Sequence, residues 1–208
     1  MIAGVGMVIA LVATLFLEEI VTYQWIALGT IFGAPIGYFS AKKVKMTSMP
    51  EMVALFNGVG GGAVALIALS EYFHWTDLDI GITTDVEVAS LFSLIIGSIS
   101  FWGSVVAFLK LSERISGRPI ALPGQKLINA ALFLGAVGIS VVMLVSTGMD
   151  PYSYTIGIAV LAGVLGLFFV LPIGGADMPV VISTLNAMTG LAAAAAGPAS
   201  ARPDDVAG

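Results

Sequence analysis

The sequence contains no cysteine, only one histidine and little charge. Without cysteine there is no disulfide framework, no thiol nucleophile and no cysteine-based metal site. Asp, Glu, Lys and Arg make up 10% of the 208 residues, whereas soluble domains carry roughly 25% charged residues. So few charges cannot cover a surface exposed to water, and no basic patch indicates nucleic-acid binding. These deficits exclude an ordinary soluble domain.

Hydrophobic residues take the place of charge and make up 58% of the chain. They form uncharged runs about as long as the roughly 20 residues that a helix needs to cross a bilayer. The runs do not alternate as barrel strands do, and backbone amides in lipid must be satisfied within their own element. We therefore expect an all-α, polytopic transmembrane helical bundle of about seven spans over residues 1–197. The runs are Met1 to Leu17, Val21 to Ala41, Met52 to Ser70, Val88 to Leu109, Leu127 to Met149, Pro151 to Ala176 and Met178 to Gly197.

Helix-start signals and one change of composition mark the limits of these runs. Ser48-Met49-Pro50-Glu51 is a capping box with proline in the first turn, and Asp177-Met178-Pro179 places an Asp cap before another early proline. Residues 198–208, rich in Pro, Ala and Asp, predict a disordered tail or an added, non-native segment. The sequence thus predicts one membrane domain followed by a short tail.

Basic residues predict the orientation of the bundle. Seven of the eight fall on one side of the predicted membrane, namely Lys42, Lys43, Lys45, Lys110, Arg114, Arg118 and Lys126. Loops rich in Lys and Arg stay in the cytoplasm. With seven spans, the amino terminus and the loop that carries Asp177 are then predicted to be cytoplasmic.

Three of the predicted helices carry a face of small and weakly polar residues. The members are Ala54, Asn57, Gly58, Gly61 and Ala65; Ser90, Ser93, Gly97, Ser100 and Ser104; and Ser183, Asn186, Gly190 and Ala194. Close helix packing accounts for the glycines and serines. An unpaired amide in hydrocarbon costs several kcal/mol, so Asn57 and Asn186 are expected to face the bundle interior. A hydrated seam among these three helices is the alternative to packing alone.

The candidate residues leave open which group would carry a proton. Asparagine does not titrate. His74 lies beside Tyr72 and Trp75, where an interfacial role is the stronger interpretation. Asp177 either caps the last helix or responds to a partner at the cytoplasmic face. The glycine groups do not form a phosphate-binding motif, so no dinucleotide is expected to bind this chain by itself.

Three stretches nevertheless point to a known family. They are LPIGGADMPVVISTLNAMTGLAAAAAG from Leu171 to Gly197, AKKVKMTSMPEMVALFNGVGG from Ala41 to Gly61, and GSISFWGSVVAFLKLSERISGRPIALPG from Gly97 to Gly124. Together they resemble the membrane domain of the beta subunit of proton-translocating NAD(P) transhydrogenases. The resemblance implies an oxidoreductase and translocase complex that couples hydride transfer from NADH to NADP to proton movement across the membrane.

The resemblance also assigns roles to single residues. Asn186 matches an asparagine of the proton route, Ser104 matches a serine near it, and Asp177 matches an acidic residue that faces the NADP(H) domain. Asn57 departs from the family, because many relatives carry a proton-relaying histidine at this position. We therefore expect an alpha-type membrane subunit to supply a titratable histidine beside Asn57 and Asn186.

Further expectations concern the assembly. The resemblance implies that NAD(H) and NADP(H) bind in associated soluble domains, that the whole complex is a dimer, and that it lies in the bacterial inner membrane. Relatives carry one more span before the position of Met1 and another after that of Gly197, so this chain is expected to be part of a longer subunit. The rival interpretations are an unrelated secondary transporter or ion channel, and a structural anchor without transport.

Overall fold

The computed structural model describes residues 2–16, 23–77, 83–146 and 150–199, and no strand occurs within them. The predicted all-α class is confirmed. The last helix continues to Ala199, two residues beyond the predicted end of the membrane domain. The rest of the predicted tail, residues 200–208, lies outside the described residues.

The chain divides into two compact units, of which the first comprises residues 1–45. This unit holds helices α1 (Ile2–Leu15) and α2 (Tyr23–Lys43). The hydroxyl of Tyr23 donates to the carbonyl of Leu15 at 3.4 Å, which joins the start of α2 to the end of α1. The unit is therefore a helical hairpin.

The second unit comprises residues 46–208 and contains five long helices. In chain order, its elements are η1 (Met46–Ser48), α3 (Met49–Asp77), α4 (Thr84–Leu111), α5 (Gln125–Val145), α6 (Pro151–Val170), η2 (Gly175–Asp177) and α7 (Met178–Ala199). Helices α3 and α7 begin one residue before Pro50 and Pro179, as the start signals predict.

Five helices, α3 to α7, are long and apolar enough to cross a membrane. Each of the seven predicted runs overlaps one α-helix, which agrees with the count of about seven. A membrane crossing by α1 and α2 stays a prediction, since α1 is described over 14 residues and α2 carries several polar groups. The length and composition of the five helices support a multi-pass membrane protein.

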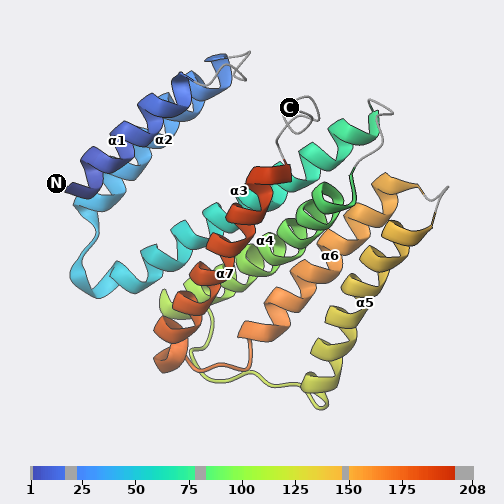
Figure 1. The fold of residues 1–208 in the computed structure, drawn as a ribbon. Helices are drawn as coiled ribbons and strands as arrows, with labels where there is room; N and C mark the ends of the chain where they lie inside the picture. The colour runs from blue at the N-terminus through green and yellow to red at the C-terminus, as the bar shows by residue number, and fades with distance from the viewer. Residues whose placement is uncertain (1, 17–22, 78–82, 147–149, 200–208) are drawn as a thin grey trace. The chain divides into compact units, whose positions relative to one another are not determined.

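Helix α4 is the centre of the second unit: it packs against α3, α6 and α7, whereas α5 packs mainly on α6 (Figure 1). Glycine allows two of these helix pairs to approach closely. A Cβ atom on Gly97 would lie 2.8 Å from the backbone of α3, and one on Gly166 would lie 2.5 Å from the carbonyl oxygen of Ile99. Small residues thus determine how near α3 and α6 come to α4.

Candidate functional site

A buried polar cluster lies where α3, α4 and α7 meet. The amide nitrogen of Asn57, a residue only 7% exposed, donates to the hydroxyl of Ser104 at 2.8 Å and that of Ser100 at 3.3 Å. The amide oxygen of Asn57 accepts a hydrogen bond from the Thr189 hydroxyl at 3.4 Å. The oxygen atoms of Ser100 and Thr189 are 2.5 Å apart. We call these four residues, Asn57, Ser100, Ser104 and Thr189, the polar cluster.

The hydroxyls of the polar cluster have more acceptors than protons. Thr189 can donate to Asn57, to Ser100 or to the carbonyl of Leu185 at 2.9 Å. Ser100 can donate to Thr189 or to the same carbonyl at 3.3 Å. Each hydroxyl carries one proton, so these bonds are alternatives. The donors can therefore reverse by hydroxyl rotation while the helices stay in place.

Two more buried serines of α4 lie between the polar cluster and the start of the helix. Ser93 donates to the carbonyl of Ala192 at 2.9 Å, and so joins α4 to α7 a second time. Ser90 is 2% exposed, and its buried hydroxyl has no partner among the described residues. The predicted interior faces of α3 and α4 are confirmed, because all ten of their members are buried.

The predicted interior face of α7 is wrong. Ser183, Asn186, Gly190 and Ala194 are all exposed in this chain, and Asn186 is not among the partners of Asn57. The larger residues Met178 and Leu185 are fully buried, and they turn a neighbouring face of α7 toward α4. This rotation brings Thr189 into the cluster and directs Asn186 outward.

The other candidates lie away from the cluster. Asp177 ends η2 and is exposed at the start of α7, while His74 is exposed near the end of α3, its ring 6.1 Å from that of Trp75. The polar cluster itself consists of amide and hydroxyl groups, which do not titrate near neutral pH. Within the described ranges, no group of three or more His, Asp or Glu side chains could hold a metal ion.

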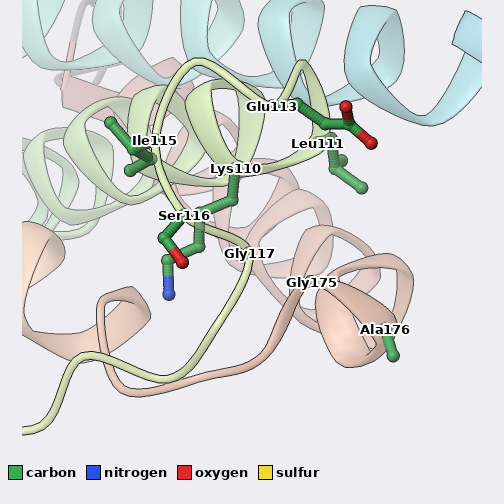
Figure 2. A pocket seen from close by; sticks show the side chains of 8 residues that line it. All are labelled: Lys110, Leu111, Glu113, Ile115, Ser116, Gly117, Gly175 and Ala176. Atoms are coloured by element: carbon green, nitrogen blue, oxygen red, sulfur yellow. The ribbon is translucent and has the colours of Figure 1, made fainter.

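Sequence reasoning missed a buried charge, Lys110, and placed it in a loop. The residue belongs to the last turn of α4 and is only 2% exposed. Its ammonium group donates to the carbonyls of Leu171 at 2.5 Å, Ile173 at 2.7 Å and Arg118 at 3.5 Å. Lys110 also lines a cavity of about 530 Å³ between the loops that follow α4 and α6 (Figure 2).

Thr189 and Lys110 are the two residues of these sites that the sequence analysis did not single out. Thr189 is a hydroxyl residue within an apolar helix, and it lies one helical turn after Leu185. Lys110 stands between Leu109 and Leu111, which indicates an apolar surrounding. The acceptors of its ammonium group are distant backbone carbonyls, and no local pattern identifies those.

Comparison with known proteins assigns the family. A family profile described as NAD(P) transhydrogenase beta subunit matches residues 1–202. Two curated relatives, both named NAD(P) transhydrogenase subunit beta, come from Rhodospirillum rubrum, one of them from a specified strain of that species. Each is 38% identical over 197 residues, which is 93% of this chain and 42% of the relative. The chain thus spans less than half the length of these relatives, and it belongs to the NAD(P) transhydrogenase beta subunit family.

Proposed function

We propose that this chain forms part of the proton-conducting membrane domain of a transhydrogenase complex. In this role it would couple hydride transfer from NADH to NADP to proton movement across the membrane. The observation that carries the proposal is the polar cluster, buried among three apolar helices, with hydroxyl protons that have alternative acceptors. Such a network can pass a proton onward once a titratable group delivers one, because each hydroxyl both donates and accepts.

The titratable group is proposed to come from a partner. The relatives are named as a beta subunit, which implies an alpha-type subunit in the same complex. The cluster contains amides and hydroxyls only, so a proton carrier is needed beside it. We assign this task to a histidine on a membrane helix of the alpha-type subunit, whose ordinary pKa near 6.5 suits reversible protonation.

The outward face of α7 supports a place for that helix. Asn186 is exposed between Ser183 and Gly190, in a helix whose composition suits hydrocarbon. An amide that faced lipid would be costly, whereas one that faces a neighbouring helix or water is satisfied. In this arrangement Asn57 would hold the polar cluster on one side of α7, and Asn186 would hold water beside the partner's histidine on the other.

Coupling to the nucleotides would act through the cytoplasmic loop of Asp177. NAD(H) and NADP(H) would bind in soluble domains of the complex, and the NADP(H) domain would dock at this exposed carboxylate. A change of nucleotide state can open the proton site to the other side of the membrane only if the docked domain binds the two states with different affinity. We further propose a dimeric complex in the bacterial inner membrane, with the amino-terminal end of this segment in the cytoplasm.

Two leucine substitutions test the proposal in reconstituted vesicles that contain the partner subunit and the nucleotide-binding domains. Asn57→Leu and Asn186→Leu should each lower the number of protons moved per hydride transferred by about ten-fold or more, since each removes an amide that positions the hydroxyls or water of the proposed route. A pH-sensitive dye inside the vesicles gives the proton flux, and nucleotide absorbance gives hydride transfer.

The same variants separate the two asparagines by stability. Asn57→Leu should lower the unfolding free energy of the chain in detergent by about 1–3 kcal/mol, because it leaves buried hydroxyls without their donor. Asn186→Leu should leave that stability unchanged, since the side chain is exposed in this chain. Normal proton flux in both variants would contradict the proposed route, and would favour the structural anchor. Flux of another solute in the absence of nucleotides would favour a transport role other than proton conduction.

A further inference from the structure

Lys110 is a buried charge held by backbone carbonyls rather than by a carboxylate. A buried ammonium costs several kcal/mol unless it is well paired, and inside membrane proteins such groups mark functional sites. All three of its N–H groups have an acceptor, since three carbonyls accept from it. One of these carbonyls belongs to Leu171, the C-cap residue of α6. A cation there satisfies the negative end of the helix dipole, so α4 caps α6.

The carbonyls that bind Lys110 come from two loops that are also bonded to each other. The amide of Gly175 donates to the carbonyl of Gly117 at 2.7 Å, and the amide of Ile120 donates to that of Leu171 at 3.0 Å. Figure 2 shows Gly117 on one loop beside Gly175 on the other, with the Lys110 side chain extending from α4 toward this loop region. The loops at residues 112–124 and 171–177 therefore form one layer, and the side chain of Lys110 bonds to both of them.

The end of α4 is itself held in a defined position. Glu113 adopts a φ of 56°, the amide of Arg114 donates to Leu109 at 3.0 Å, and that of Glu113 donates to Lys110 at 3.2 Å. These bonds form a Schellman motif, in which the left-handed position is usually a glycine. A non-glycine residue costs roughly 1–2 kcal/mol in this conformation. The helix end thus tolerates strain to place Lys110 and the following loop together.

Lys110 connects this layer to the polar cluster through one rigid helix. Ser104 precedes Lys110 by six residues of α4, a rise of about 9 Å at 1.5 Å per residue. In the other direction, Asp177 follows the bound carbonyl of Ile173 by four residues and ends η2. A displacement of the Asp177 loop that carries residues 171–173 with it would therefore strain the bonds of Lys110 to the end of α4.

We propose that Lys110 is a positioning residue that transmits movement of the Asp177 loop to α4, and so to Ser100 and Ser104. This inference rests on the proposed function. In this role Lys110 does not itself carry a transported proton. Its ammonium keeps the loop layer and the end of α4 together. Docking at the cytoplasmic face would then move α4 and change the distances between the side chains of the polar cluster.

Lysine substitutions in the reconstituted complex test this role. Lys110→Met should lower the protons moved per hydride by about five-fold or more, the lower end of ordinary coupling energies. Lys110→Arg should retain most of the ratio, since it keeps the charge and the donors. Lys126→Met removes an exposed lysine from the start of α5 and should leave the ratio unchanged. A purely structural role would lower both rates in proportion to the amount of complex and leave the ratio intact.

A reversible cross-link provides an independent measurement. The chain has no cysteine, and the amide of Gly175 donates to the carbonyl of Gly117, so Gly117→Cys with Gly175→Cys places two thiols on adjoining residues of the two loops, which oxidation can join. In the Lys110→Met background, oxidation of the two thiols should raise the number of protons moved per hydride, and their reduction should lower it again. If Lys110→Met alone does not assemble, the comparison is made between its oxidised and reduced double-cysteine forms.

The outcomes distinguish this inference from the proposed function. A complex with the native residues that transfers hydride without moving protons would contradict the proposed function. If the native complex pumps, a normal ratio in Lys110→Met, or a ratio indifferent to the disulfide in that background, would overturn the role of Lys110 alone.

Discussion

The two sides of α4 are packed with equal closeness but differ in chemistry. Toward α6, Gly166 allows contact with the backbone at Ile99, and Gly163 accommodates the ring of Trp102. Toward α3, Gly61 and Gly97 allow a similar approach. Only the side facing α3 and α7 adds the polar cluster. Small residues therefore account for helix packing on both sides, and a functional site requires the additional amide and hydroxyl groups.

The region between α4 and α5 is different again. A cavity of about 340 Å³ lies there, lined by Ile96, Ile99, Asn129, Ala130, Phe133, Leu165, Phe169 and Met188. Helix α5 buries few of its own side chains within this chain, namely Gln125, Ala136, Ser140 and Met143. The comparison indicates that the α3 side holds its polar groups in close contact, whereas the α5 side contributes apolar cover.

The largest expected effect follows from the close contact between α3 and α4. Gly61→Leu would place a Cβ atom 2.9 Å from Ser100 and 3.0 Å from the backbone of Phe101, so the helices must separate. We expect a loss of about 3 kcal/mol or more of unfolding free energy, the upper end of overpacking. Gly138→Leu on α5 has no atom within 4 Å of its Cβ and should change stability by less than about 0.5 kcal/mol.

Thermal unfolding in detergent measures both variants. Equal midpoints for Gly61→Leu and Gly138→Leu would show that the contact of α3 with α4 is not the rigid part of the bundle. A folded Gly61→Leu protein with normal proton flux would show further that the polar cluster tolerates separation of its helices.

The sequence predicted the inward faces of α3 and α4 because both combine helical spacing with residues too small to serve as lipid-facing surface. It failed for α7, which has two adjacent faces of similar polarity. Thr189 occupies one and Asn186 the other, and the choice depends on how Leu185 packs against α4. Lys110 could not be placed, because its partners are backbone carbonyls more than 60 positions away in two cases.

A smaller effect should distinguish the two faces of α7. The hydroxyl of Thr189 belongs to the polar cluster, whereas Thr184 is exposed and donates to the carbonyl of Val180 in its own helix at 3.0 Å. Thr189→Val should lower stability by about 0.6 kcal/mol, the average for hydrogen bonds between membrane helices. It should also lower the proton-to-hydride ratio, since it removes one reversible donor.

Thr184→Val is the matched control, because it makes the same exchange of hydroxyl for methyl on the same helix. It should leave both quantities unchanged. Equal proton-to-hydride ratios for the two variants would mean that the inward hydroxyl has no part in the route. The two sides of α4 would then differ in chemistry but not in function.

The smallest effect is expected at the third asparagine, Asn129 on α5, whose amide oxygen is buried without a hydrogen-bond partner among the described residues. An unsatisfied buried acceptor is destabilising, so Asn129→Leu should leave stability unchanged or raise it by up to about 1 kcal/mol. The proton-to-hydride ratio should stay normal, in contrast to Asn57→Leu, which makes the same exchange on the α3 side. A ten-fold loss of proton flux in Asn129→Leu would place a proton route on the α5 side as well, since the cavity there would then have to hold water for the amide to bind.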